Sequence, residues 1–264
     1  MIKAQKDYKP YEVVLECPPF VHNINDKYKG QVCDHCLTKS DGLKKCANCG
    51  HMYYCNRNCQ RNDWRAGHRY ECQIFKNHYQ NLEDINNLAK PLLRLYLNIK
   101  ADPQIVNRMY DTVDGKQRCF NDLMTHNEDI MRDSHRCNNI IDLYDRISSS
   151  GVELSLNDFI NFYGKYVINS YEICFGDNIH PPHRPCGTGM FIGASVLNHS
   201  CASNVCFQSV GNKLLIISEQ YIKAGDELTV SYLNKCLLMP TDRRRMQLKS
   251  YYYFDCHCRR CDNN

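Results

Sequence analysis

The chain has 264 residues, of which 23% are charged and 43% hydrophobic, and its formal net charge is +4. This composition excludes a disordered chain, and so small a charge does not by itself indicate a nucleic-acid-binding protein. Apolar runs fall short of the ~18 residues that a membrane span needs, and the polar start shows no secretory signal.

Cysteine is the exception, with 18 residues. Without a secretory signal, closely spaced cysteines are typical of metal ligands rather than disulfides. The composition therefore predicts a soluble, intracellular protein that is rich in zinc.

The first cysteine cluster holds eight potential ligands, enough for two closed tetrahedral zinc sites. They are Cys33, Cys36, Cys46, Cys49, Cys55, Cys59, His68 and Cys72. The segment is too small to bury much core, so bound metal would supply its folding free energy. Spacing alone does not choose between sequential and cross-braced pairing. The positive residues around Trp64 are interpreted as a solvated face, so contact with nucleic acid is not expected.

Residues 80–168 have the pattern of helices. Apolar residues recur at helical spacing from Leu82 to Ile99, with Pro91 as a kink or break, and again from Ile140 to Ile147. Asp102-Pro103 and the pair Ser155 and Asp158 are helix-start signals. We interpret these apolar stripes as core packing.

Residues 190–233 have the pattern of strands. Val205–Val210 and Lys213–Gln220 flank Gly211-Asn212, which predicts a hairpin with a two-residue turn. A second turn is expected at Lys223–Asp226, followed by β-type alternation over Leu228–Leu233.

The chain closes with Cys256-x-Cys258-x2-Cys261, which offers three thiolates. Tetrahedral zinc needs a fourth ligand from elsewhere in the chain. The candidates are Cys201, Cys206, Cys236 and His257.

The eight-ligand cluster resembles a MYND zinc finger. The resemblance implies cross-braced sites, one with Cys33, Cys36, Cys55 and Cys59, the other with Cys46, Cys49, His68 and Cys72. It also implies a proline-rich peptide as a binding partner.

Asn198-His199-Ser200-Cys201, the segment Gly225-Asp226-Glu227-Leu228 with Tyr232 downstream, and the terminal triad resemble a SET domain with its post-SET zinc site. With the finger, the chain resembles the SMYD family of protein-lysine methyltransferases. The implied fold is α+β, with SET-type small β-sheets, a helical insert, an inserted MYND finger and a post-SET zinc site. The expected divisions are a truncated N-terminal SET strand region (1–32), the finger (33–72), a helical linker and SET insert (73–165), the SET core (166–235) and a post-SET zinc segment (236–264).

The resemblance implies methylation of a lysine in a protein, histone or other, with S-adenosyl-L-methionine as methyl donor and three structural zinc ions. Tyr232 and Tyr252 are the implied catalytic residues. The implied cofactor-binding residues are Asn169, Asn198, His199 and Phe254, and Cys201 is the implied fourth ligand of Cys256, Cys258 and Cys261. The expected location is the nucleus, the cytoplasm or both, with a role in chromatin regulation and without a membrane.

The chain departs from the family in three places. No Gly-x-Gly segment precedes the finger, so the chain is expected to enter the fold at Tyr11–Leu15, one strand late. Ser203 stands where the family has proline, and the chain stops at Asn264, before the family's C-terminal helical domain. The missing segment motivates an alternative hypothesis, a catalytically weak or inactive scaffold that recruits partners through the finger.

Overall fold

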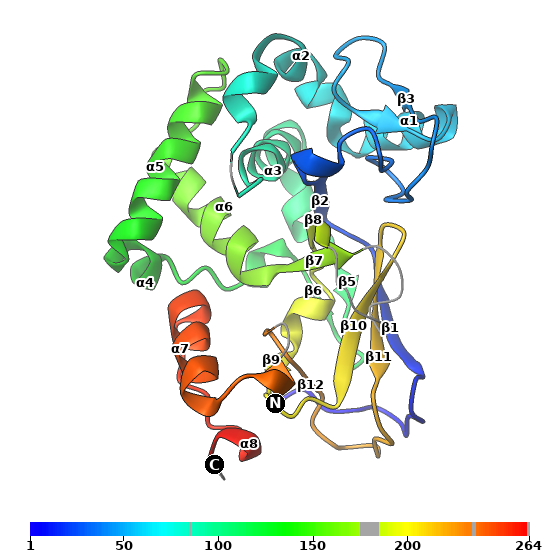
Figure 1. Cartoon of the computed structure of the whole chain (residues 1–264), viewed down its shortest axis with the longest axis vertical. Helices are drawn as coiled ribbons and strands as arrows, with labels where there is room; N and C mark the ends of the chain where they lie inside the picture. Colours follow the sequence, from blue (N-terminus) through cyan, green and yellow to red (C-terminus); the bar gives the residue numbers. More distant parts are fainter. Residues whose placement is uncertain (85, 175–184, 234–235, 263–264) are drawn as a thin grey trace.

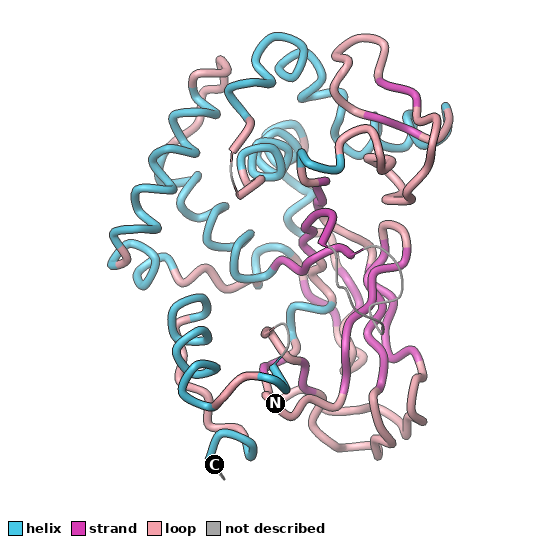
Figure 2. Tube along the Cα trace, viewed as in Figure 1, coloured by secondary structure: helices cyan, strands magenta, loops and turns pink. Residues whose placement is uncertain are grey.

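The structure is a computed structural model, and it describes residues 1–84, 86–174, 185–233 and 236–262. Most helices lie in the upper part of the molecule and the longer strands below and to the right of them, with the last two helices at the lower left (Figure 1); Figure 2 shows the same arrangement by secondary structure. The predicted α+β class is confirmed. No described helix combines the length and apolarity that a bilayer crossing requires.

Two three-stranded antiparallel sheets form the β part. The first has the order β1 (Val13–Cys17), β11 (Lys213–Ser218), β10 (Val205–Val210), and the second β2 (Val21–Ile24), β8 (Pro185–Met190), β7 (Ser170–Cys174). Val210 pairs with Lys213 across a two-residue turn, which confirms the predicted hairpin. Gly211 there has a φ of +57°, a conformation that side chains disfavour.

A short parallel pair supplies the framework of the SET-like motif. β9 (Asn198–His199) pairs with β12 (Thr229–Val230), and Ser200 N donates to Val230 O at 3.1 Å. The two motifs that resembled a SET domain, about 30 residues apart, therefore lie side by side.

The N-terminal segment enters the fold before Tyr11, so the expected late entry was wrong. Ala4 N donates to Asp226 O at 2.9 Å, and Tyr8 N to Ile222 O at 2.8 Å. Ala4 and Tyr8 are both buried in the core of the β part. The polar composition of this stretch hid these contacts, because main-chain groups make them.

The predicted helical stripes correspond to α3 (Ala89–Ala101), α5 (Ser134–Ser148) and α6 (Leu156–Asn169). Pro91 lies in the first turn of α3, where its missing N–H costs nothing, so it neither kinks nor breaks that helix. The stripe is not continuous from Leu82, which ends a separate 3-10 turn; Ile85 lies outside the described residues. Asp102 caps the short turn that follows α3, and Ser155 caps α6.

Residues 110–118 were expected to be helical and instead form a hairpin of β5 (Tyr110–Asp111) and β6 (Gln117–Arg118). Gly115 in its turn has a φ of +73°, which a helix does not permit. β8 is a strand that alternation could not predict, because it contains two glycines. A Cβ on Gly187 would lie 2.1 Å from Asn23 O, so the close strand contact requires glycine.

The remaining strands and helices belong to the finger, to the helical part and to the C-terminal end of the chain. They are β3 (Lys44–Lys45), β4 (Tyr53–Tyr54), α1 (Arg57–Asp63), α2 (Arg69–His78), α4 (Asn127–Arg132), α7 (Thr241–Tyr252) and α8 (Arg259–Asp262). The finger shares one apolar core with α3, α5 and α6, the sheets have a second, and a small third cluster ties α7 to Cys201.

Candidate functional site

Among the residues that the structure describes, three groups of four side chains have the chemistry and spacing of zinc sites. Within each group the ligand atoms all lie within 4.8 Å of one another. Tetrahedral zinc with ~2.3 Å bonds to sulfur separates its sulfur ligands by about 3.8 Å. The Sγ–Sγ distances are 3.6 Å for Cys36 and Cys55 and 3.8 Å for Cys46 and Cys72. Soft ligands at this spacing fit zinc.

The finger's two groups are cross-braced. Their members are Cys33, Cys36, Cys55 and Cys59 in one, and Cys46, Cys49, His68 and Cys72 in the other. His68 turns Nε2 toward Cys49 Sγ at 3.6 Å, so that nitrogen is the metal-facing one. Both sets are those that the MYND resemblance implied.

The third group joins Cys201 to Cys256, Cys258 and Cys261. Cys201 Sγ lies 3.5 Å from Cys261 Sγ, whereas Cys236 Sγ lies 3.7 Å from the main-chain oxygen of Cys201 and is not a member of the group. Of the four candidates for the fourth position, the structure brings Cys201 to the terminal triad. This group fastens the end of the chain beside β9.

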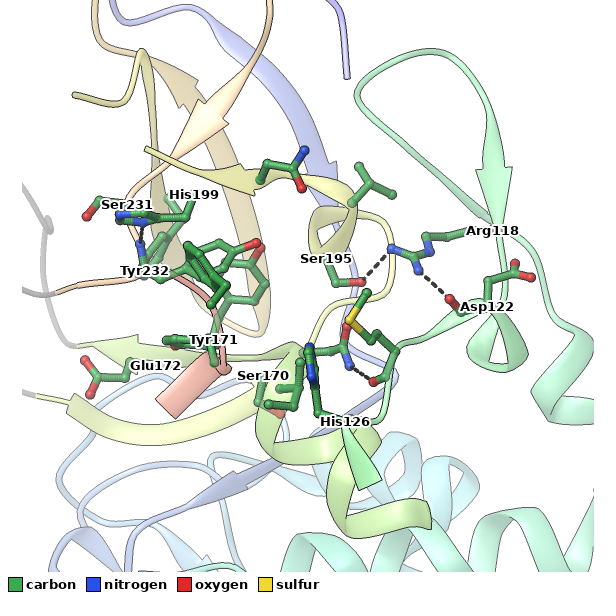
Figure 3. A pocket seen from close by; sticks show the side chains of 18 residues that line it. Arg118, Asp122, His126, Ser170, Tyr171, Glu172, Ser195, His199, Ser231 and Tyr232 are labelled. Atoms are coloured by element: carbon green, nitrogen blue, oxygen red, sulfur yellow. Dashed lines mark hydrogen bonds between the residues drawn. The ribbon is translucent and has the colours of Figure 1, made fainter. Parts of the chain in front are cut away.

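One cavity contains all six predicted cofactor-binding and catalytic residues. Its volume is about 720 Å³, within the usual range of ligand sites. Figure 3 shows side chains from separate elements converging on it. The predicted residues on its wall are Asn169, Asn198, His199, Tyr232, Tyr252 and Phe254.

Aromatic rings form one side of the cavity. The centroid of the Tyr232 ring lies 4.8 Å from that of Tyr252 and 6.4 Å from that of Phe254. The Tyr232 hydroxyl donates to Leu197 O at 2.6 Å. Burial raises the pKa of Tyr232 to about 12, so the hydroxyl keeps its proton at neutral pH.

His199 connects this aromatic wall to the third cysteine group. Its Nδ1 accepts from Tyr232 N at 2.9 Å, and its Nε2 lies 3.2 Å from Cys201 Sγ. Burial, helped by the charge of Arg244, lowers the pKa of His199 to about 4. The ring is therefore neutral, and it positions Tyr232 relative to the metal ligands.

The two asparagines differ in how they are held. Asn169 donates through Nδ2 to Met124 O at 2.9 Å and to Lys165 O at 2.8 Å, which fixes its amide. Asn198 is exposed, and its side chain makes no hydrogen bond within the described ranges. Its amide is therefore available to a ligand.

Sequence reasoning missed the opposite side of the cavity. It is formed by residues of the segment 118–126, among them Arg118, Asp122, Met124 and His126, and Glu172 of β7 lines the cavity near the aromatic wall (Figure 3). The first four lie in turns and a short strand without any periodic signal, so no pattern singled them out. Glu172 lies within Asn169–Ile173, a segment that resembles one of the SMYD family and contains the predicted Asn169, and this was the available signal.

A buried charge network supports the finger's second group. Arg94 on α3 donates through Nε to both Glu71 carboxylate oxygens at 3.0 Å, and through Nη1 to Asp63 Oδ1 at 3.0 Å. Glu71 Oε1 in turn lies 3.3 Å from His68 Nδ1. Burial raises the pKa of Glu71, but the charge of Arg94 and the hydrogen bonds with His68 and Arg94 together outweigh burial and lower that pKa to about 2. A carboxylate behind a metal-binding histidine orients the ring.

Comparisons with known proteins agree with this geometry. The model of the protein family described as "MYND finger" matches residues 33–72. The chain is 26% identical to N-lysine methyltransferase SMYD2-B of Xenopus laevis over 98% of its length and 57% of that protein. It is 27% identical to histone-lysine N-methyltransferase SMYD3 of Mus musculus, over 98% of the chain and 58% of that protein. It is also 27% identical to histone-lysine N-methyltransferase ASHR1 of Arabidopsis thaliana, over 98% of the chain and 52% of that protein.

The chain has a MYND finger at residues 33–72 and an α+β body that holds the third cysteine group and the cavity. The finger match and the relatives support the assignment of this chain to the SMYD family. The chain spans a little more than half the length of the curated relatives that it matches.

Proposed function

We propose that the chain is an S-adenosyl-L-methionine-dependent protein-lysine N-methyltransferase. One observation carries the proposal: six residues chosen for this chemistry, from four separate stretches of the chain, line a single cavity. Those stretches are the end of α6, β9, the segment after β12, and the end of α7 with the residues after it. The names of the relatives, all lysine methyltransferases, support the same reaction.

The cavity suits a cationic methyl donor. Its wall includes two carboxylates, Asp122 and Glu172, and one guanidinium, Arg118, among the residues that the structure describes. The aromatic faces of the wall attract cations and offer a stacking surface to a purine ring. S-Adenosyl-L-methionine would supply an electrophilic methyl group on its sulfonium centre.

The residues of the chain would prepare a lysine amine for methyl transfer. The nucleophile must be the neutral amine, although a free lysine has a pKa of ~10.4. A half-apolar, partly enclosed site disfavours the ammonium form and lowers that pKa. Tyr232 remains neutral and cannot act as a base near pH 7, so its role is to orient the amine and complement the charge that develops on the methyl group.

The zinc ions would be structural in this mechanism. Each ligand group is complete with four protein ligands, which leaves no open position for a substrate. The third group would keep Tyr252 and Phe254 in place, since they precede its ligands by a few residues.

The finer points of the function are proposals too. We propose a histone or another protein as substrate, a proline-rich peptide as partner of the finger, and residence in the nucleus, the cytoplasm or both. The five-segment division of the chain stays a prediction. The inactive-scaffold alternative has no specific observation in its favour.

Transfer of a tritium-labelled methyl group tests the proposal. The zinc-loaded protein is incubated with labelled cofactor and a panel of histones and other lysine-rich proteins, alongside Tyr232→Phe. We expect label on lysine with the wild type and a much lower rate with the variant. Equal rates would remove Tyr232 from the catalytic assignment. Failure of the wild type to bind the cofactor would contradict the proposed function.

A further inference from the structure

Arg118 places a positive charge on the cavity wall without a carboxylate partner. It lies at the end of β6, and none of its nitrogens is within 4.0 Å of a carboxylate oxygen among the described residues. Arg94, by contrast, is buried and neutralised by Asp63 and Glu71. A half-buried cation next to a ligand cavity therefore needs an explanation.

The protein satisfies only part of the hydrogen-bonding capacity of this guanidinium. Arg118 Nη1 donates to Ser195 Oγ at 3.3 Å, and Nη2 donates to Asp122 O at 2.7 Å. A guanidinium has five N–H groups in a planar fork, so two are used and three are left. The two neutral acceptors hold the fork at the cavity wall (Figure 3) without cancelling its charge.

The neighbouring carboxylate is engaged elsewhere. Asp122 Oδ2 accepts from Cys119 N at 2.8 Å, which closes the short turn after β6. Asp122 reaches Arg118 with its main-chain oxygen instead. Burial lowers the pKa of Arg118, and the charge of Asp122 only partly opposes that effect. The guanidinium is thus partly dehydrated, and it can still donate to a charged acceptor.

The composition of the cavity narrows the choice of that acceptor. Arg118 is the only lysine or arginine on the wall within the described part of the chain, and Asp122 and Glu172 also line it. A phosphate or another multiply charged anion would meet more repulsion than attraction there. A ligand with one carboxylate and with positive charge elsewhere would be attracted both by the guanidinium and by the carboxylates of the wall. A guanidinium fork can bind such a carboxylate in a bidentate manner.

We propose that Arg118 is a specificity-determining residue that binds the carboxylate of the amino-acid part of the methyl donor. The inference rests on the proposed function and adds to it a direction for the ligand. The amino-acid part lies toward β6 and Ser195, and the purine lies toward the aromatic wall at Phe254. Ser195 is a positioning residue, since it accepts from Arg118 while its own hydroxyl donates to Ile192 O at 2.9 Å.

Titration calorimetry with a pair of ligands tests this assignment. The pair is S-adenosyl-L-methionine and its decarboxylated analogue, which lacks only the carboxylate. The proteins are the wild type, Arg118→Leu and Arg118→Lys, with Lys116→Leu as matched control from the same hairpin, where the side chain of Lys116 is 80% exposed. Circular dichroism and a thermal melt establish that each variant is folded.

A charge-assisted hydrogen bond implies an effect of about tenfold to a hundredfold. We expect the wild type to bind the intact ligand more tightly than the analogue by that factor. Arg118→Leu should weaken the intact ligand to the level of the analogue and leave the analogue unchanged. Arg118→Lys should recover part of the difference, and Lys116→Leu should behave as the wild type.

The outcomes separate this inference from the proposed function. If Arg118→Leu weakens both ligands equally, or the wild type does not distinguish them, Arg118 does not bind the carboxylate, although the methyltransferase proposal stands. If the wild type binds neither ligand, both proposals are wrong.

Discussion

The finger and the cavity are built by opposite means. In the finger, eight ligands within 40 residues converge on two points, and metal coordination supplies what a small core cannot. The cavity gathers side chains between Arg118 and Phe254 from strands, helix ends and turns, held by main-chain pairing and apolar packing. The third cysteine group combines the two means, because its metal ligands hold in place the chain segment that forms part of the cavity wall. From this difference we expect that loss of zinc from the finger disturbs only the finger, whereas loss of zinc from the third group also disturbs the cavity.

Removal of one ligand from each kind of group tests that contrast most severely. We expect Cys258→Ser and Cys59→Ser each to retain two zinc ions of the three that the ligand groups predict. Cys258→Ser should abolish cofactor binding, because structural zinc contributes ~10–16 kcal/mol and Tyr252 and Phe254 depend on that group. Cys59→Ser should leave the cofactor Kd within about threefold of the wild type, or ~0.6 kcal/mol. Metal analysis and calorimetry measure both quantities, and the reverse ranking would refute the contrast.

Arg94 tests whether the finger is an independent module. Arg94→Met leaves Asp63 and Glu71 buried without a cation, which should lower the free energy of unfolding by about 3–5 kcal/mol in urea denaturation. Zinc release to a chelator should be faster from the second finger group. Arg132→Met is the control, since that side chain is 74% exposed.

A triple variant separates charge from packing at this point. Addition of Asp63→Asn and Glu71→Gln to Arg94→Met should restore part of the lost stability, because no unpaired buried charge remains. An Arg94→Met protein as stable as the wild type would mean that the network does not join the finger to α3.

Tyr232→Phe tests the catalytic assignment with the cavity left intact. We expect kcat to fall by about 10²–10³ and the cofactor Kd to change little, because the hydroxyl acts mainly in the transition state. The rate should rise with pH as the substrate amine loses its proton. The pKa of Tyr232 is raised to about 12, so at any pH below about 12 the ionisation of Tyr232 should not reduce the rate.

The pH profile of the variant is the discriminating readout. The rising limb should keep its position in Tyr232→Phe, because it reports the amine. A limb that disappears with the hydroxyl would instead make Tyr232 the titrating group, contrary to its raised pKa.

Gly67 offers the mildest test, at the joint between the finger and α3. Its φ is +153°, and a Cβ there would lie 2.5 Å from Asn98 Oδ1. We expect Gly67→Ala to cost about 1–3 kcal/mol. Asn98→Ala in the same chain should recover part of that loss in thermal unfolding. If Gly67→Ala lowers the free energy of unfolding equally with and without Asn98→Ala, the cost comes from backbone strain alone.

The sequence predicted best what depends on neighbours in the chain. The ligand spacings, the turn at Gly211-Asn212 and the stripe of α5 are local patterns, and the structure contains each of them. Asn198 and Tyr232 were identified by resemblance, because no periodicity marks a residue within or just after a two-residue strand.

What the sequence could not predict depends on distant pairs. Arg94 meets Glu71 across 23 positions, and nothing in either segment indicates the pairing. Arg118 lies in a hairpin that was expected to be helical, so its place on the cavity wall required the fold. Ala4 and Tyr8 join the β part through main-chain hydrogen bonds, which side-chain patterns do not report.

Titration of the zinc-loaded protein with S-adenosyl-L-methionine tests the central claim most directly. The account predicts one binding event per chain, weakened by Phe254→Ala, which removes a ring from the cavity wall. No heat of binding at millimolar cofactor, from protein that carries all its zinc, would contradict it.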